Sequence, residues 1–396
     1  MQNASTWRVQ WLGAMNEVDR EAWDRLALPL ASPLMEWRWL HLLEASGSIS
    51  PALGWQPRHL TLWDGRRLVA AAPLYIKTHS EGEFVFDHWW AQVAESQGID
   101  YYPKLVGMSP ATPSVGYRFL VADDVDAAEA VGRLFAAIDA YCREARLSGC
   151  HLNFVDRSWF ARWPQDGFIG WRHQSYLWRN RDFHAFDDYL KRFNASQRRN
   201  IRRECRSMSA QGIEIRPLYG DAISPAMAET MYRFYLNTNA RYGPWAARFL
   251  NRDFFDRVFR DYRRRLLLMA AYRDGASEPV ALSMLLVKDR HLIGRYWGGV
   301  GDYKDLHFNM CFYAPIRWAI AHGIRTFDPG AGSPHKIYRG FRAVANTSLH
   351  RFYHPRMAMI FRALIDEVNA AEQANIEALN RHLPFAKTNA ASGDGP

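Results

Sequence analysis

The chain has 396 residues, of which 48% are hydrophobic and 14% aromatic. This composition supplies enough apolar side chains for two cores and excludes a wholly disordered chain. Lys and Arg exceed Asp and Glu by 50 − 41 = 9 residues. The positive balance favours anionic partners but does not select among nucleotide carriers, RNA and acidic lipid surfaces.

The cysteines and the N-terminal segment bear on the compartment and on metal binding. The four cysteines are scattered without a Cys-x-x-Cys pair, at Cys142, Cys150, Cys205 and Cys311. We therefore expect reduced, buried thiols, and neither a disulfide framework nor a zinc site. Residues 1–9 contain no apolar signal region, and no stretch approaches the roughly 18 apolar residues of a membrane span. These observations predict a cytoplasmic protein without a bound metal or integral membrane association.

The first half of the chain is predicted to form helices, a hairpin, and then a further helix and strand. Asn16 or Asp19 caps the first helix, and Ser32-Pro33 opens the second. Asp64-Gly65 separates two β-compatible runs, which is a strong hairpin signal. The expected elements are a helix through residues 23–26, a helix through 37–43, strands at 58–63 and 68–76, an irregular aromatic segment at 79–120, a helix at 127–147 and a strand at 150–155.

The second half repeats this order. Its expected elements are helices over 186–208 and 225–237, strands at 266–272, 280–287 and 291–297, a helix at 308–322 and a strand at 324–327. Pro315 falls inside the last helix and is expected to kink it or to remove a backbone hydrogen bond. The recurrence predicts an α+β fold used twice, each time as a mostly antiparallel sheet flanked by helices. The predicted domains are residues 1–175 and 176–355, followed by a C-terminal helix and a disordered tail in 356–396.

The stretch 327–341 follows the last predicted strand and contains the strongest candidate site. Turn-forming residues break the chain after Asp328, and His335, Lys336 and Arg339 follow closely. A cation held just beyond a strand end can bind an anion or stabilise a developing negative charge. On local sequence alone, a surface turn with solvated positive residues is an equal alternative.

Five groups of short motifs, in order over most of residues 32–355, resemble a known family. They are Tyr101-Tyr102-Pro103-Lys104-Leu105 with Thr112-Pro113, Arg198-Arg199-Asn200-Ile201-Arg202-Arg203-Glu204, Gly294-Arg295-Tyr296-Trp297-Gly298, His307-Phe308 with Cys311, and Pro329-Gly330-Ala331 through His335-Lys336 to Arg339-Gly340-Phe341. The twofold pattern resembles tandem GNAT-type acyltransferase domains, the arrangement of the Fem aminoacyl-tRNA transferases that build peptidoglycan cross-bridges. More closely, the chain resembles the bacterial FemAB-like family of peptidoglycan biosynthesis or recognition proteins.

The resemblance implies an N-acyltransferase, in which a neutral amine attacks an activated acyl group and forms an amide. Such an enzyme contributes positioning and oxyanion stabilisation and needs no covalent intermediate. No nucleophile elbow, Walker loop or His-Glu-x-x-His motif is present. The acyl donor is then a co-substrate, namely acyl-CoA, an acyl carrier protein or aminoacyl-tRNA, and no tightly bound cofactor is expected. The acceptor is an amine-bearing small molecule or peptide.

The predicted catalytic residues lie in the second domain. The resemblance implies that Lys336 supports the acyl donor or the tetrahedral intermediate, while His335 is a candidate proton acceptor and Asp328 a candidate base or orienting group. The alternatives are a surface lysine, a structural histidine, and a carboxylate that caps its own turn. The family usually has an acidic residue where Pro334 stands and Glu where Asn309 stands. These departures motivate a second hypothesis, a catalytically reduced binding module for cell-wall precursors or RNA.

Two further groups of residues are predicted to bind substrates. The substrate-binding group, expected near a cleft between the domains, is Arg339, Arg295, Tyr296, Trp297, Tyr101, Tyr102, Lys104, His307 and Asn309. The carrier-binding group forms basic stripes on one helix and could contact phosphates of tRNA or another carrier; it is Arg198, Arg199, Arg202 and Arg203. The alternatives are an ion pair for Arg339, packing for the aromatic residues, and a solvated basic face for the helix. The sequence leaves the oligomeric state open.

Overall fold

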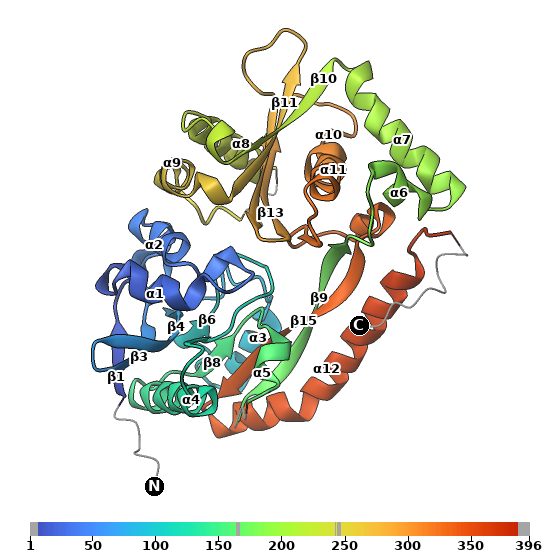
Figure 1. Cartoon of the computed structure of the whole chain (residues 1–396). Helices are drawn as coiled ribbons and strands as arrows, with labels where there is room; N and C mark the ends of the chain where they lie inside the picture. The colour runs from blue at the N-terminus through green and yellow to red at the C-terminus, as the bar shows by residue number, and fades with distance from the viewer. Residues whose placement is uncertain (1–6, 164–166, 242, 244–246, 387–396) are drawn as a thin grey trace. The chain divides into compact units, whose positions relative to one another are not determined.

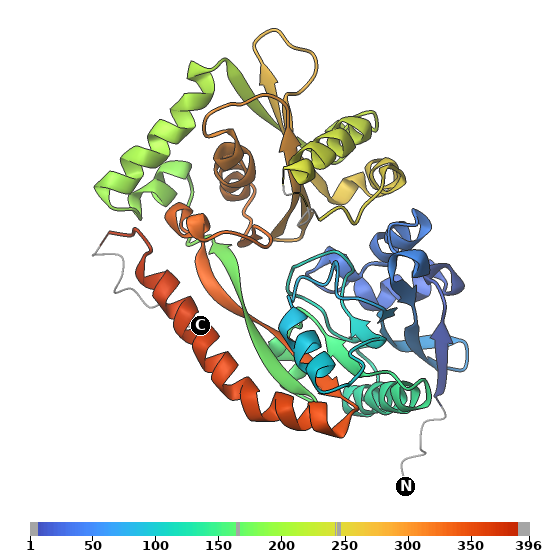
Figure 2. The same cartoon turned by 180° about the vertical axis from the view of Figure 1, so that it is seen from behind.

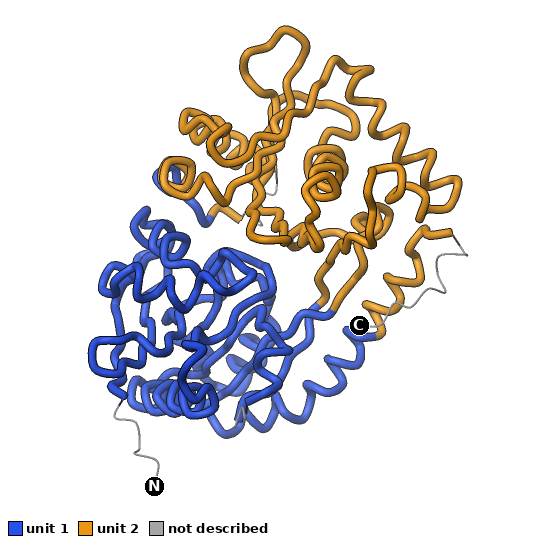
Figure 3. The backbone as a smooth tube through the Cα atoms, viewed as in Figure 1, with its two compact units in different colours: residues 1–173, 249–254, 345–373 blue, residues 174–248, 255–344, 374–396 orange. Residues whose placement is uncertain are grey.

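The structure is a computed structural model that describes residues 7–163, 167–241, 243 and 247–386 (Figure 1). The chain forms two compact units (Figure 3). Unit 1 contains residues 1–173, 249–254 and 345–373, and unit 2 contains residues 174–248, 255–344 and 374–396. The domain boundaries predicted from the sequence stay a prediction. The predicted disordered tail from residue 389 onward lies outside the described residues.

Unit 1 contains one four-stranded sheet and part of a second sheet. Its elements are β1 (Arg8–Leu12), η1 (Met15–Glu17), α1 (Arg20–Ala27), η2 (Pro33–Met35), α2 (Trp37–Ala45), η3 (Pro51–Leu53), β2 (Trp55–Pro57), β3 (His59–Asp64), β4 (Arg67–Ala72), β5 (Leu74–Lys77), α3 (His88–Ser96), β6 (Lys104–Gly107), β7 (Leu120–Val121), α4 (Ala127–Glu144), β8 (Gly149–Leu152) and α5 (Arg157–Phe160). The first sheet has the order β1-β3-β4-β7, with antiparallel pairs throughout. The second continues as β8-β6-β5-β2, in which β6 and β8 run parallel.

Local sequence signals account for much of unit 1. Asp19 caps α1 as predicted, because its Oδ1 accepts the N–H of Ala22 at 2.8 Å. The predicted hairpin forms between β3 and β4, where Asp64 pairs with Arg67 around the left-handed Gly65. The helix α4 buries one apolar face against the strands and ends at Glu144, close to its predicted end.

Unit 2 is built on an antiparallel meander that ends in a parallel pair. Its elements are α6 (Phe186–Lys191), α7 (Ala195–Ala210), β10 (Ile213–Tyr219), η4 (Gly220–Ala222), α8 (Met227–Ala240), α9 (Arg252–Asp261), which begins in unit 1, η6 (Arg263–Arg265), β11 (Leu266–Arg273), β12 (Ala281–Lys288), β13 (His291–Gly299), α10 (Leu306–Phe308), η7 (Asn309–Tyr313), α11 (Ala314–Ala321), β14 (Thr326–Asp328) and η8 (Pro334–Arg339). The strand order is β10-β11-β12-β13-β14-β9, with β13 and β14 parallel. Helix α8 covers one face of this sheet, and η7 with α11 covers the other (Figures 1 and 2).

Three long elements pass from one unit into the other. They are β9 (Ile169–Arg179), β15 (Arg342–Phe352) and α12 (Pro355–Arg381). The helix α12 is the predicted C-terminal helix. With mixed, mostly antiparallel sheets and flanking helices in both units, the predicted α+β class is confirmed.

The structure differs from the sequence expectation at several elements. The segment 79–120 was expected to be irregular but contains α3, β6 and the first residue of β7. The other elements that were not expected are β1, β2, β9, β10, β15, α5 and α9. Pro217 lies inside β10 and argues against a strand, but β10 is an edge strand, where proline is tolerated. The helix expected at 308–322 is divided into α10, the π-helical η7 and α11. Pro315 lies in the first turn of α11, so its missing N–H falls just after the π-helical turn.

Of the four free cysteines, Cys142 and Cys150 are buried as expected, whereas Cys205 and Cys311 are only half-buried. Within the described ranges, every helix is too short or too polar to cross a membrane.

Candidate functional site

The parallel strands of unit 2 separate where the candidate residues begin. Residues 291–293 of β13 pair with residues 326–328 of β14, while β13 continues to Gly299. A register shift against β12 leaves Arg295 as an extra residue on β13. Bulges of this kind bend a strand and are common next to binding sites. After Asp328 the chain turns into the loop that carries Lys336.

A cavity of about 350 Å³ lies beside the end of β13 and the start of α10. It is lined in part by Trp297 and His307, two of the predicted substrate-binding residues, whose rings are 4.6 Å apart. The glycine-rich connection between these elements forms another wall. Gly298 is required for packing, because a Cβ there would lie 2.0 Å from the carbonyl oxygen of Phe234 in α8.

Asp305 also lines this cavity, and the sequence reasoning missed it. It precedes α10 with a left-handed φ of 61°, a conformation that Asp adopts more readily than most residues. Its Oδ2 is buried without a hydrogen-bond partner among the described residues. A buried acceptor without a donor is costly, so an ammonium or N–H group of a ligand would be stabilised there.

Lys336 lies in η8 with only 4% of its surface exposed. Its Nζ donates to the carbonyl oxygens of Gly330 at 2.7 Å and Ala331 at 2.8 Å, and lies 5.2 Å from the ring centre of Tyr176. Burial lowers the pKa of the ammonium to about 8, although the charge of Asp328 opposes the shift. The surface-lysine alternative does not fit this geometry.

His335 precedes Lys336 in the sequence, and its ring packs against the rings of His307, Phe308 and Phe312. Its Nδ1 is 3.0 Å from Oγ of Ser333, and its ring centre is 5.9 Å from that of His307. Its Nε2 is buried without a hydrogen-bond partner in the described part of the chain. Burial, with the charges of Arg339 and Lys336, lowers the pKa of His335, so the ring is neutral at pH 7 and can accept a proton. Burial, with the charges of His335, Arg339 and Lys336, lowers the pKa of His307 to about 4.

Arg339 is held by a buried carboxylate. Its Nη2 lies 3.1 Å from Oε2 of Glu204, its Nη1 donates to the carbonyl oxygen of His335 at 2.9 Å, and its guanidinium stacks 3.5 Å from the ring centre of Phe308. The hydroxyl of Tyr313 donates to the same carboxylate. This geometry matches the ion-pair alternative, and direct substrate binding by Arg339 stays a prediction.

Asp328 and Asn309 both make hydrogen bonds within the protein. Oδ1 of Asp328 accepts the N–H of Gly330 at 2.8 Å, as expected for a carboxylate that caps its own turn. Nδ2 of Asn309 donates to the carbonyl oxygens of Glu204 at 2.8 Å and Asp305 at 3.0 Å. Asn309 therefore joins α7 to the start of α10.

The bulge interrupts the regular alternation of side chains along β13. Regular alternation would place Arg295 and Tyr296 on opposite faces, but Nη2 of Arg295 lies 2.6 Å from the hydroxyl of Tyr296. The extra residue interrupts the alternation at this point. Tyr296 packs against Tyr235 and Phe255 at ring distances of 5.3 and 6.0 Å, which fits the packing alternative.

The basic stripes of α7 face solvent. Arg199, Arg202 and Arg203 are exposed and Arg198 is half-buried, while Glu204 lies on the buried face of the helix. Arg202 has an exposed ion pair with Asp187 at 3.4 Å. The exposed arginines could contact a polyanion, and their carrier-binding role stays a prediction.

The predicted substrate-binding residues of unit 1 lie close together, but they contact buried carboxylates of the protein itself. Nζ of Lys104 donates to Ser80 at 2.8 Å, Glu83 at 3.0 Å and Asp87 at 2.5 Å. The hydroxyl of Tyr101 donates to Asp87 at 2.8 Å, and that of Tyr102 is 2.7 Å from Oγ of Ser80. Lys104 thus uses all three of its N–H groups within the protein, which favours a structural role over direct substrate contact.

A family model described as FemAB-like, peptidoglycan biosynthesis/recognition, matches residues 14–387. The chain belongs to the FemAB-like family. Its fold is similar to that of FemX, with a TM-score of 0.53 and 10% identity over 89% of this chain and 99% of FemX. It is also similar to the C-terminal domain (DUF2156) of a protein named as a lysylphosphatidylglycerol synthetase from Agrobacterium fabrum, with a TM-score of 0.51 and 9% identity over 90% of this chain and 97% of that one. These likenesses establish the predicted acyltransferase-type fold. The comparison with curated proteins gave no match to the chain.

Two buried ionisable groups of this FemAB-like chain were absent from the predicted site. Burial raises the pKa of Glu83 to about 7, although Lys104 opposes the shift, and burial lowers the pKa of Lys77 to about 7. Nζ of Lys77 lies 3.7 Å from the ring centre of Trp55. The available sequence signal was a run of three apolar residues flanked by Glu83 and Asp87, just before an aromatic helix and near a lysine-containing strand.

Proposed function

We propose that this FemAB-like protein transfers an acyl or aminoacyl group from an activated carrier to an amine, forming an amide. The family and the fold support acyl transfer as the reaction type. The observation that carries the proposal is the buried ammonium of Lys336, which lies just beyond the strand β14 and 5.2 Å from the ring centre of Tyr176.

Lys336 would stabilise negative charge on the carbonyl oxygen of the donor. Two of its three N–H groups are used by Gly330 and Ala331, which fixes the ammonium and leaves one donor. A preorganised charge in a water-poor site stabilises an oxyanion strongly. His335 is the candidate to accept the proton of the attacking amine, since its ring is neutral and its Nε2 has no hydrogen-bond partner in the described residues.

The cavity beside Trp297 suits the amine-bearing part of a substrate. Among the described residues that line it, Asp302 and Asp305 carry negative side chains and Arg241 carries a positive one. Two carboxylates disfavour a phosphate and favour an ammonium, such as that of an aminoacyl group or of the acceptor. Among the expected donors we therefore favour aminoacyl-tRNA, with acyl-CoA and an acyl carrier protein as the other candidates. The basic face of α7 is proposed to contact the carrier.

A binding module for cell-wall precursors or RNA is the second candidate function. It is favoured by Pro334 and Asn309, which replace acidic residues typical of the family, and by Asp328, whose Oδ1 is engaged in its own turn. A module of this kind would bind its ligand without forming an amide.

The two functions are separated by product formation. Native mass spectrometry of freshly purified protein would identify a co-purified carrier, and that carrier would then be assayed with a panel of amines. Amide formation by the wild type, reduced about 100- to 1,000-fold in Lys336→Ala, supports the proposal. The matched control is Lys304→Ala, which removes an exposed lysine of the same unit. Tight binding without a covalent product would favour the binding module, and undiminished turnover in Lys336→Ala would remove the lysine from the mechanism.

A further inference from the structure

The short helix η8 begins with a serine whose side chain does not cap it. Ser333 occupies the N-cap position with φ −67° and ψ 152°, the extended geometry in which a serine hydroxyl usually accepts a backbone N–H group of the first turn. Its side chain makes no such bond. Pro334 follows at the first helical position and has no N–H group to be capped. The hydroxyl of Ser333 is therefore available to another partner.

That partner is the imidazole of His335. Oγ of Ser333, an exposed residue, lies 3.0 Å from Nδ1 of His335. The imidazole packs against the rings of His307, Phe308 and Phe312, at centre distances of 5.9, 5.5 and 5.9 Å. Nε2 of His335 is buried and has no hydrogen-bond partner among the described residues. The two ring nitrogens thus have different environments, one at an exposed hydroxyl and the other in the protein interior.

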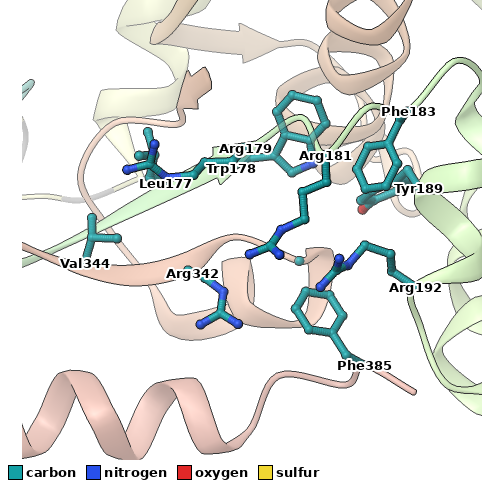
Figure 4. Close-up of a pocket in the computed structure, with 11 residues that line it drawn as sticks. Leu177, Trp178, Arg179, Arg181, Phe183, Tyr189, Arg192, Arg342, Val344 and Phe385 are labelled. Atoms are coloured by element: carbon teal, nitrogen blue, oxygen red, sulfur yellow. The ribbon is translucent and has the colours of Figure 1, made fainter. Parts of the chain in front are cut away.

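Other contacts hold η8 in place. At its C-terminal end Gly340 has a left-handed φ of 73°, and the hydroxyl of Tyr189 donates to the carbonyl oxygen of Arg339 at 2.9 Å. Tyr189 and Gly340 also line a pocket that adjoins this end of the helix (Figure 4). The position of η8 therefore does not depend on the hydroxyl of Ser333, and removal of that hydroxyl should leave the fold intact.

The hydrogen bond to Ser333 bears on which nitrogen of His335 carries the proton. Burial, with the charges of Arg339 and Lys336, lowers the pKa of His335, so the ring is neutral at pH 7 and carries one proton. With the proton on Nδ1, the ring donates to the hydroxyl of Ser333 and Nε2 keeps a lone pair. With the proton on Nε2, a buried N–H group would have no acceptor, which is rarer in proteins than a buried acceptor without a donor. The Nδ1–H form is the better satisfied of the two.

We propose that Ser333 is a positioning residue that holds His335 in the Nδ1–H tautomer and so makes Nε2 the proton acceptor. The catalytic consequence rests on the proposed acyl transfer. As the C–N bond forms and the bond from the acyl carbon to the carrier breaks, the proton of the amine passes to Nε2 and then to the departing oxygen or sulfur of the carrier. The transient imidazolium still donates from Nδ1 to Ser333, and this hydrogen bond is stronger while the ring is charged.

The tautomer can be read by NMR of the whole protein labelled with nitrogen-15 histidine, with His335→Gln to assign the signals. We expect the Nδ1–H form of His335 in the wild type at pH 7. Ser333→Ala should lose this form, whereas Ser333→Thr, which restores a hydroxyl, should retain it. The matched control is Ser277→Ala, which removes the hydroxyl of an exposed serine between β11 and β12 and should also retain it. All three serine variants should melt close to the wild-type temperature.

Acyl transfer gives a second readout. In Ser333→Ala, kcat should fall about 10-fold with little change in KM, because one hydrogen bond of ordinary strength shifts the tautomer population by about that factor. Ser333→Thr should recover the rate. Ser333→Asp keeps an acceptor for Nδ1–H and adds a negative charge, which should raise the pKa of His335. The ring then stays protonated to higher pH, so the acidic limb of the pH profile should move to higher pH.

Three results would overturn the inference. They are an Nε2–H form of His335 in the wild type, an Nδ1–H form that persists in Ser333→Ala, and a changed tautomer in Ser333→Ala with acyl transfer at the wild-type rate. The last would show that Nε2 does not accept the proton. If the wild type forms no amide with any donor, the proposed function fails, while loss of the Nδ1–H form in Ser333→Ala would still support the role of Ser333.

Discussion

Oε2 of Glu204 lies 3.1 Å from Nη2 of Arg339, and the two residues are 135 positions apart in sequence. Glu204 occupies the buried face of α7, a helix whose other faces carry exposed arginines. Arg339 ends η8, the short helix that contains Lys336. A carboxylate from a basic helix thus helps to fix the segment that holds the candidate catalytic lysine.

Glu204→Gln should destabilise the protein by about 3–5 kcal/mol in urea unfolding, because Arg339 would keep a buried charge without a counter-ion. The double variant Glu204→Met with Arg339→Met should lose less than the sum of the single losses, since both charges are removed together. Additive losses would mean that the pair is not coupled. A stable double variant that fails to bind the acyl donor would support the predicted substrate-binding role of Arg339.

Lys336 should impose an alkaline limb on the pH profile of acyl transfer. With a folded pKa of about 8, the ammonium is present below pH 8 and is lost as the pH rises further, so the rate should fall above that value. Lys336→Arg should shift the limb beyond the measurable range, because arginine stays protonated. A wild-type limb that persists unchanged in Lys336→Arg would assign the titration to another group.

Lys336 also has a predicted effect on stability. Its folded pKa is below its ordinary value, so the unfolded state binds more protons between about pH 8 and 10.5. Stability should therefore rise with pH across that window, and Lys336→Met should flatten the slope. Urea unfolding at pH 8 and pH 10 measures the difference.

Elements with local signals could be predicted from the sequence. Asp19 caps α1, and Asp64-Gly65 forms a hairpin, because capping and turn chemistry act over a few residues. Lys336 could be placed after a strand end because the preceding apolar run and the glycine turn are contiguous with it. Its burial, in contrast, depends on Tyr176 from a distant strand.

The features that could not be predicted depend on pairing between distant segments. The sequence offered no indication that Glu204 would meet Arg339, or that Lys104 would be enclosed by Glu83 and Asp87. The bulge at Arg295 depends on how β13 pairs with β12. The alternation of residues along β13 alone cannot reveal that pairing.

The buried ionic cluster of unit 1 should make stability depend on pH. Glu83 has a folded pKa of about 7, above its ordinary value, so the folded state binds more protons between about pH 4.5 and 7. The contribution of this group to stability should fall as the pH rises through that window, and Glu83→Gln should remove the fall. Urea unfolding at pH 5 and pH 7 tests this, with Glu95→Gln as a control at an exposed glutamate of the same unit.

Lys104→Met should be more damaging at neutral pH than at acidic pH. The variant leaves the carboxylates of Glu83 and Asp87 buried without their cation, at a cost of about 3–5 kcal/mol at pH 7. Protonation of the carboxylates at lower pH should reduce the loss relative to the wild type. An equal loss at pH 5 and pH 7 would show that Lys104 acts through packing and not through charge.

Asp305 is expected to recognise the ammonium group of a substrate. Asp305→Asn retains a side chain that tolerates the left-handed backbone, so the fold should be preserved. Affinity for an amine-bearing substrate should fall about 10- to 100-fold, because a charge-assisted hydrogen bond is weakened, whereas affinity for its N-acetylated analogue should be unchanged. Asp302→Asn is the comparison variant and should lose less affinity, since Asp302 lines the same cavity but is exposed, and water already solvates its carboxylate. An equal loss of affinity for the amine and for its acetylated analogue would show that Asp305 shapes the cavity and does not recognise the charge of the ligand.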